Sequence, residues 1–339
     1  MSEKPKIIVV TPIKNEAWIL NRFLDITSKF ADLIIIADQQ STDSSREICK
    51  RWEKVVLLDN PDKTYNEASR QLLLLAKARE LVPGPKVIFA LDADEILAAN
   101  ALKTAEWQKI LDAQPGTAIF VEKPDLYLTP ETCIRWRDNP FPIAYVDDGS
   151  VHQPQFVHSV RIPLTSKTNR LILKDVKVLH YALANPALQE AKVRYYSVLE
   201  NTKNISKSIG RRHVYRKTFL NKFKSKAEPV EQCWFQGWED MGINLRSIQT
   251  DVAHLFAWHD FEVLRLFSDH GPKRFYWDDI WYISWEERRQ YALKNGLLGI
   301  PLQPINSPTK IDQNLRNICS SAYGLLLRIR NHLRSFCSS

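Results

Sequence analysis

The chain has 339 residues, of which 44% are hydrophobic and 25% charged, a balance typical of a globular protein with a sizeable core. No apolar run approaches the ~18–20 residues that a membrane-spanning helix needs, and the N-terminus lacks a signal-peptide pattern. The five cysteines are scattered without a CxxC pair, which favours reduced thiols and a cytoplasmic protein. The net charge of +8 suits an anionic partner, but a nucleotide, an acidic glycolipid, a membrane surface and a nucleic acid all qualify.

The first part of the chain predicts alternating strands and helices. Short apolar runs typical of buried strands lie at 7–10, 33–36, 54–58 and 87–91, and helical patterns lie between them at 16–30, from 41 onward and at 65–81. One strand and one helix in every ~25–30 residues is the rhythm of a parallel sheet. We therefore expect an α/β fold, with a Rossmann-like, mostly parallel sheet flanked by helices.

The turn after the first predicted strand contains no glycine, since the first glycine of the chain is Gly84. The GxGxxG and GxxxxGK[ST] phosphate loops both need glycine there, so backbone amides are not expected to hold phosphate at this turn. Asp92 and Asp94 follow the fourth predicted strand, at the edge where α/β sheets bind ligands. These carboxylates could hold a divalent cation that binds a diphosphate, or they could form a surface turn that caps a helix near Ile96.

Three stretches carry a resemblance to a known family. They are VTPIKNE at 10–16, IIADQQSTD at 35–43 and LDADE at 91–95. In this order and spacing they resemble the GT-A nucleotide-sugar glycosyltransferases, specifically family 2, and LDADE resembles the DxD motif of that family. A further stretch, NEASR at 66–70, resembles the family's helix that precedes the DxD strand. The resemblance covers roughly the first hundred residues and implies a GT-A fold.

The resemblance also implies roles for individual residues. Asp94 would ligate a divalent metal, Mn²⁺ or Mg²⁺, with His180 as a further ligand, although a satisfied histidine at a strand end is the alternative. Gln39 stands where many relatives carry an acid, which leaves the nucleotide base open. The residues expected to bind the nucleotide sugar are Thr11, Pro12, Lys14, Glu16, Asp38, Arg70 and Asp92; as an alternative, Asp38 could form a turn and Glu16 could start a helix.

The general base is harder to place. The stretches 156–161 and 171–180 look like paired strands, and Ser159 follows His158 where relatives often have glutamate. Serine cannot deprotonate a sugar hydroxyl well, so either the base lies elsewhere or the match at this position is false. Glu239 and Asp240 resemble the Glu-Asp pair that supplies the base in other family members. Asp147 and Asp148 are rivals, and ordinary surface acids are the alternative for all of them.

The last part of the chain changes character after residue 185. A helical pattern at 187–203 is followed by a basic run at 211–226, which is either a solvated face or a contact with an anionic partner. Tryptophans at 234, 238, 258, 277, 281 and 285 could stack on an acceptor sugar or pack a core. Prolines at 301, 304 and 308 indicate a linker, and an amphipathic helix follows from 315 to 333. Its apolar stripe suits a membrane surface, the body of the protein or a second subunit.

The expected organisation is a GT-A catalytic domain at 1–185, a mainly helical extension on the acceptor side at 186–300, and a linker with a C-terminal helix at 301–339. The expected activity is that of a metal-dependent, inverting glycosyltransferase of hexosyltransferase type, acting on a glycan or glycolipid in surface polysaccharide or lipopolysaccharide synthesis. A nucleotidyltransferase is the alternative, although it needs a glycine-rich loop that is absent here. A non-catalytic protein of the same fold that binds a nucleotide, a membrane or a nucleic acid is another. We expect no nucleic-acid partner, and we leave open a peripheral position at the inner face of the membrane.

Overall fold

The structure is a computed structural model that describes residues 4–62, 66–205, 208–216, 220–248 and 257–337. The chain forms two compact units. The first comprises Met1–Asn185 and Lys226–Thr250, and the second comprises Pro186–Ser225 and Asp251–Ser339. Residues 226–250, which the sequence placed in the extension, therefore group with the first unit. Among the described residues, no helix is both long and apolar enough to cross a membrane.

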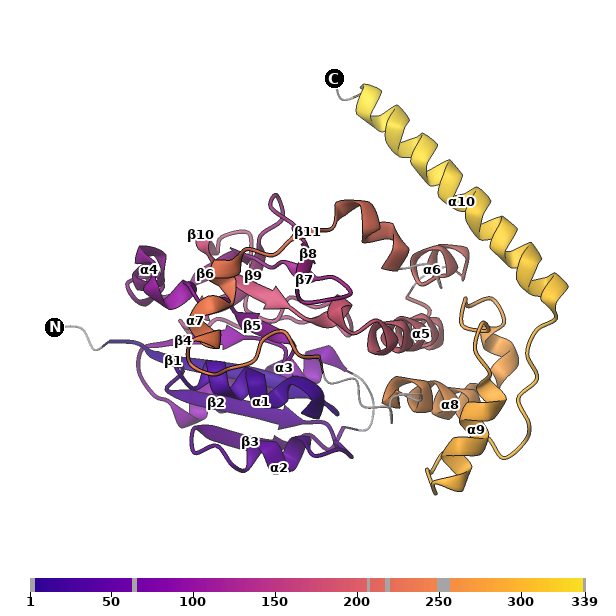
Figure 1. The fold of residues 1–339 in the computed structure, drawn as a ribbon, viewed down its shortest axis with the longest axis horizontal. Coiled ribbons are helices and arrows are strands. Elements are labelled where there is room, and N and C mark those ends of the chain that lie inside the picture. Colours follow the sequence, from indigo (N-terminus) through magenta and orange to yellow (C-terminus); the bar gives the residue numbers. More distant parts are fainter. Residues whose placement is uncertain (1–3, 63–65, 206–207, 217–219, 249–256, 338–339) are drawn as a thin grey trace. The chain divides into compact units, whose positions relative to one another are not determined.

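The first unit is built on a mixed, mostly parallel sheet (Figure 1). Its strands are ordered β11-β8-β7-β10-β6-β9-β4-β1-β2-β3, with β5 paired to β10 beside this path. This is the expected α/β class, a mostly parallel sheet flanked by helices, and it is consistent with a GT-A fold. The strands are β1 (Lys6–Ile13), β2 (Leu33–Asp38), β3 (Val55–Asp59), β4 (Lys86–Ala90), β5 (Glu95–Leu97), β6 (Thr117–Glu122), β7 (Asp125–Leu126), β8 (Thr132–Ile134), β9 (Phe141–Val146), β10 (Asn169–His180) and β11 (Glu228–Pro229).

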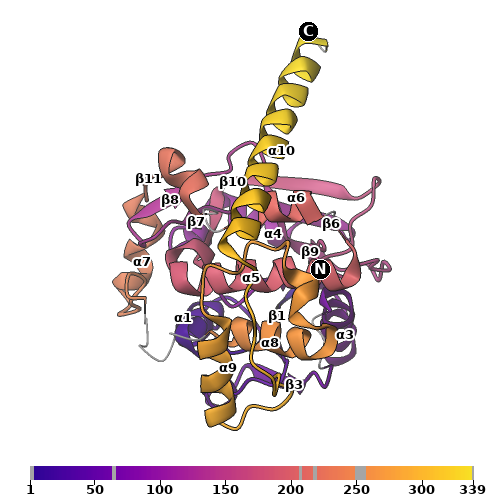
Figure 2. The same cartoon turned by 90° about the vertical axis from the view of Figure 1, so that its right-hand side faces the viewer.

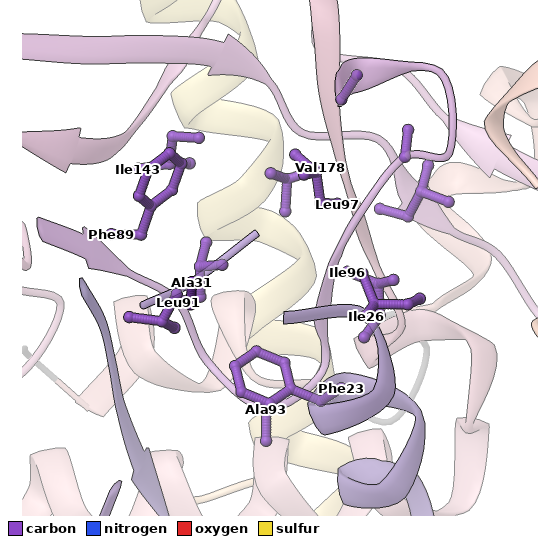
Figure 3. Close-up of a cluster of buried hydrophobic side chains, with 14 of the residues drawn as sticks. Phe23, Ile26, Ala31, Phe89, Leu91, Ala93, Ile96, Leu97, Ile143 and Val178 are labelled. Carbon is purple, nitrogen blue, oxygen red and sulfur yellow. The ribbon is translucent and has the colours of Figure 1, made fainter. Parts of the chain in front are cut away.

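Helices cover both faces of this sheet. Alternate side chains of β1 belong to two different apolar clusters. Ile7 and Val9 belong to the cluster that contains residues of the helix α1, whereas Ile8 and Val10 belong to the cluster that contains residues of the helix α3. Figure 3 shows part of the first cluster, in which Phe23 of α1 belongs with side chains of β4, β9 and β10. Burial on both faces is what a continuous apolar strand requires. The helices of the first unit are α1 (Ala17–Thr27), α2 (Ser45–Cys49), α3 (Glu67–Leu81), α4 (Ala105–Leu111) and α7 (Gln236–Glu239).

Strand direction decides which acids can share a site. Strands β2 and β4 both run parallel to β1, so Asp38 at the end of β2 and Asp92 after β4 lie at the carboxyl edge of the sheet. Strand β9 runs antiparallel to β4 and ends beside the start of β4, where the amide of Asp147 donates to the carbonyl of Lys86 (3.0 Å). Asp147 and Asp148 therefore lie at the opposite edge.

The second unit is helical within its described residues and has its own polar framework. Its helices are α5 (Pro186–Lys203), α6 (Ser208–Val214), α8 (Trp258–His270), α9 (Trp285–Lys294) and α10 (Lys310–Cys337), which Figure 2 shows from the side. Buried Asp260 accepts from Arg194 (2.9 Å) and Arg288 (2.9 Å), which ties α5 to α8 and α9. Arg211 of the basic run pairs with buried Asp278 (2.5 Å), so part of that run serves the fold.

Two local predictions were wrong, and one alternative is excluded. Residues 156–161 form bends instead of a strand, so only 171–180 of the expected pair is extended, within β10. The second helix, expected from 41 onward, begins at Ser45 after an N-cap at Ser44, because Ser41 is engaged with the turn that follows β1. The segment at Ile96 is the strand β5, which excludes the helix-cap alternative for the acidic turn.

Candidate active site

The turns after β1 and β2 are tied together. Asn15 adopts a left-handed conformation (φ 56°), which asparagine tolerates better than most residues. Its backbone amide donates to Oγ of Ser41 (2.8 Å), and its side-chain Oδ1 accepts from the amide of Thr42 (2.7 Å). The amide of Glu16 donates to Oγ of Ser45 (2.9 Å). The first two motif stretches thus form one braced segment at the carboxyl edge of the sheet.

Asp38 lies at the end of β2 and is almost fully buried. Its carboxylate accepts from Arg46 Nη1 (2.6 Å) and from the amide of Ser41 (3.2 Å). Arg46 also pairs with Asp59 at the end of β3 (2.7 Å). The turn-forming role given above as an alternative is therefore present in the structure. A nucleotide at Asp38 would have to share this carboxylate with Arg46.

The other residues expected to bind the nucleotide lie near this braced segment or on α3. Thr11 is fully buried within β1, and Pro12 follows it there. Lys14 and Glu16 belong to the turn before α1, where Glu16 accepts from Trp18 Nε1 (2.9 Å). Arg70 lies near the start of α3.

The acidic turn Asp92-Ala93-Asp94 joins β4 to β5. The amide of Asp92 donates to Glu95 Oε2 (3.1 Å), and the amide of Tyr181 donates to the carbonyl of Asp94 (2.8 Å). In the ladder between β5 and β10, Glu95 stands opposite His180. The backbone thus brings the end of β10 against the acidic turn and fixes both.

His180 lies between two carboxylates. Its Nε2 is 3.6 Å from Asp94 Oδ2, and its Nδ1 is 2.5 Å from Asp125 Oδ1. Trp136 Nε1 donates to the second oxygen of Asp125 (2.6 Å), which fixes that carboxylate. Burial and the charge of Lys123 disfavour the charged imidazole, but Asp94 and Asp125 outweigh them and raise the pKa of His180 to about 9.

The pair Asp94 and His180 fits a divalent metal. Ligand atoms on adjacent positions of an octahedral ion with bonds of ~2.1 Å lie about 3 Å apart, and the observed separation is 3.6 Å. A carboxylate with an imidazole suits Mn²⁺, and Asp125 on the far ring nitrogen is the usual partner that orients a ligating histidine. Within the described residues there is no group of three or more His, Cys, Asp and Glu side chains placed to hold a metal.

Two cationic side chains, Lys123 and Arg161, lie beside the acidic turn. Arg161 donates to both oxygens of fully buried Glu95 (2.8 and 2.7 Å), and Lys123 lies 2.8 Å from the same carboxylate. Burial opposes ionisation of Glu95, but Arg161 and Lys123 dominate and hold its pKa well below the usual range. Arg161 also lies 3.2 Å from Asp92 Oδ1. Positive charge is thus fixed beside the acidic turn.

The acids considered for the general base lie in different places. Glu239 ends α7 and pairs with Arg246 (2.7 Å), and Asp240 follows it on the surface. Glu239 lies near Tyr181, the residue after His180, and its charge adds to the effect of burial in raising the pKa of the Tyr181 hydroxyl. Asp147 is held at the opposite edge of the sheet by Arg79 (2.8 Å). Strand direction thus disfavours Asp147 and Asp148, whereas Glu239 and Asp240 stay candidates.

The tryptophans are divided between the two units. Trp234 and Trp238 are buried in the core of the first unit, where Trp238 Nε1 donates to the carbonyl of Leu97 (2.8 Å). Trp281 and Trp285 pack on Phe267 in the second unit. These four side chains serve as core residues, which is the alternative given above.

Sequence reasoning missed Lys123, Asp125 and Arg161. Lys123 directly follows β6, and Asp125 begins β7 two residues later. The carboxyl end of β6 points to the same edge as those of the other parallel strands, so the strand-end rule could have found both residues. Arg161 lies in a stretch interpreted as a strand. Its position depends on a loop held by the pairing of Ser159 N with Glu67 Oε2 (3.0 Å), which no local pattern indicates.

Comparison with known proteins gives limited likeness. No protein-family model and no curated protein matches the chain. Among solved structures, glucosyl-3-phosphoglycerate synthase from Mycobacterium tuberculosis, in complex with Mn²⁺, uridine diphosphate and glucosyl-3-phosphoglycerate, matches 36% of this chain and 44% of its own, at 18% identity and a TM-score of 0.26. Its complex with Mn²⁺, UDP-glucose and phosphoglyceric acid matches the same shares at 19% identity and a TM-score of 0.26.

A mycobacterial protein matches 36% of the chain and 42% of its own, at 16% identity and a TM-score of 0.28. The chain thus spans less than half the length of these proteins in each match. Matches of this extent decide neither the activity nor the substrates, which depend on the residues described above.

Proposed function

We propose that the protein is a metal-dependent, inverting glycosyltransferase that moves a hexose from a nucleotide-diphosphate sugar to a hydroxyl of a glycan or glycolipid. The observation that supports this most is the placement of His180, held by Asp125 and facing Asp94 at the carboxyl edge of the sheet. The three motif stretches lie at the ends of the parallel strands β1, β2 and β4, at this same edge, as the resemblance to family 2 implies. Synthesis of a surface polysaccharide or lipopolysaccharide is the proposed context.

The proposed roles follow the geometry. Asp94 and His180 would hold Mn²⁺ or Mg²⁺, which supplies charge neutralisation for the departing diphosphate. Arg161, beside Asp92, would add a fixed positive charge. The segment from Thr11 to Glu16, with Asp38 and Arg70, would bind the nucleoside. These residues would orient the donor so that its anomeric carbon is open to attack from the face opposite the diphosphate.

The reaction needs a base for the acceptor. A carboxylate, Glu239 or Asp240, would take the proton of the acceptor hydroxyl as its oxygen bonds to the anomeric carbon. The bond from that carbon to the diphosphate oxygen breaks, and the nucleoside diphosphate leaves with the electron pair. Attack opposite the leaving group inverts the anomeric centre.

Calorimetric titration with a panel of nucleotide sugars, with Mn²⁺ or with EDTA, tests this function. We expect one donor to bind only with Mn²⁺ and to release its nucleoside diphosphate when an acceptor is present. Asp94→Asn should abolish the metal-dependent part, and Asp125→Asn should lower metal affinity ~10–100-fold because the ring of His180 loses its orienting partner. Asp112→Asn, an exposed acid after α4, is the matched control and should change nothing.

Three results would contradict the proposal in different ways. Donor binding that persists in EDTA and in Asp94→Asn would overturn the metal assignment while leaving a nucleotide-sugar site. Failure to bind any nucleotide sugar would favour a non-catalytic protein. Release of pyrophosphate in place of a nucleoside diphosphate would identify a nucleotidyltransferase.

A further inference from the structure

The C-terminal helix α10 packs on the second unit with its polar and small residues. Arg212 of α6 donates to Asn317 Oδ1 (2.7 Å), and Arg316 donates to the carbonyl of Tyr276 (2.5 Å). Among the positions of the helix whose burial is described, Ser320 and Gly324 are buried, and the ring of His213 lies against Gly324. The contacts of α10 with its own unit therefore use a face that contains little apolar surface.

The apolar stripe of α10 is exposed. At 100° per residue its side chains fall within an arc of roughly 100°, and Ser320 and Gly324 lie on the opposite side of the helix. In both views the C-terminal part of α10 extends beyond α6 (Figures 1 and 2). The residues of this stripe are each 49–73% exposed: Ile311, Leu315, Ile318, Leu325, Leu326 and Ile329. A contiguous exposed stripe of this kind indicates an interaction surface. The sequence left open that the stripe packs against the body of the protein, but in the structure these side chains are exposed.

The charge on this helix limits what can cover the stripe. Residues 313–339 contain arginines at 316, 328, 330 and 334 and no acidic residue. Two copies of α10 packed stripe to stripe would bring these like charges together without acids to pair them. An anionic lipid surface instead takes the apolar stripe into its headgroup boundary while the arginines pair with lipid phosphates.

We propose that α10 docks the protein on membranes that contain anionic lipid, lying in the plane of the surface with this stripe inserted. The helix is about 42 Å long at 1.5 Å per residue, so it offers an extended footprint. This inference rests on α10 alone and holds whether or not the proposed transferase activity is correct. Combined with that activity, it would favour an acceptor carried on a lipid.

Co-sedimentation of the full chain with vesicles tests the docking. We expect binding to phosphatidylcholine vesicles with about 30% phosphatidylglycerol to exceed binding to pure phosphatidylcholine at least ~10-fold, and to fall in about 1 M NaCl, where charges are screened. The double variant Ile318→Ser/Leu326→Ser should reduce binding at least ~10-fold, because it removes apolar side chains from the stripe.

The matched control is Leu298→Ser/Leu302→Ser, which removes two exposed leucines (each 83%) outside α10. This control should bind vesicles like the wild type, and circular dichroism should show that both variants keep their helix content. Equal vesicle binding by the stripe variant and the wild type would overturn the proposal, as would no binding at all. Sedimentation equilibrium that shows a dimer abolished by the stripe variant, without vesicle binding, would assign the stripe to a second copy and also overturn it.

Discussion

Replacing Glu95 with glutamine would remove the fully buried counter-charge that Arg161 and Lys123 share and would leave Asp92 beside Arg161 alone. In the folded protein, Glu95 is fully buried and accepts from Arg161 and Lys123, whose side chains are only 10% and 15% exposed. Glutamine keeps the shape and one acceptor oxygen but removes the negative charge. Removing one partner of a buried ion pair typically costs about 3–5 kcal/mol, because the remaining charge cannot return to water.

The expected fall in melting temperature follows from this cost. In a domain of the size of the first unit, 1 kcal/mol corresponds to about 2–4 °C, so Glu95→Gln should lower the Tm by roughly 6–20 °C. Scanning calorimetry in EDTA measures this without a contribution from bound metal. The reference is Glu80→Gln, which removes the exposed partner of Lys77 and should cost no more than about 0.5 kcal/mol.

The reasoning would be refuted if the free energy of unfolding of Glu95→Gln lay within about 1 kcal/mol of that of the wild type. Arg161 and Lys123 would then have reached solvent or other partners. A second variant, Glu95→Gln with Arg161→Met, separates the cost of the stranded cation from the other effects of losing Glu95. If the cost comes from the stranded cation, the double variant should be more stable than Glu95→Gln alone.

Three further changes test other parts of the structure. Burial lowers the pKa of His152 to about 4, so the unfolded chain binds a proton at this residue at a higher pH than the folded protein does. The free energy of unfolding should therefore fall by up to roughly 3 kcal/mol as the pH drops from about 6.5 to 4. Denaturant unfolding of His152→Gln should show a smaller fall over the same pH range. Trp238→Phe leaves the carbonyl of Leu97 unpaired in the core and should cost about 1–3 kcal/mol in the same assay, whereas a change below 0.5 kcal/mol would mean that water replaces the bond. Asn66→Ala removes the side-chain cap that accepts from Ser69 N and should cost about 1 kcal/mol in the same assay, whereas an unchanged free energy of unfolding would mean that this cap does not stabilise α3.

The sequence alone predicted the strands and helices of the sheet region well. Runs such as 33–36 and 87–91 are apolar on both faces, which occurs where helices cover a sheet on both sides. The acids that follow these runs mark where each strand ends. The order of strands and helices also implied that β2 and β4 run parallel to β1. Asp38 and Asp92 were therefore placed at one edge without any contact being known.

The tertiary structure decided the contacts that give this edge its chemistry. Asp125 lies 55 residues from His180, and Arg161 lies 66 residues from Glu95, so no local pattern could pair them. The antiparallel direction of β9 sent Asp147 to the far edge, which the spacing of residues does not reveal. Likewise the sequence showed that α10 has an apolar stripe, but only its packing through Ser320 and Gly324 showed which way the stripe faces. Local patterns determine which elements form, whereas long-range packing determines which side chains meet.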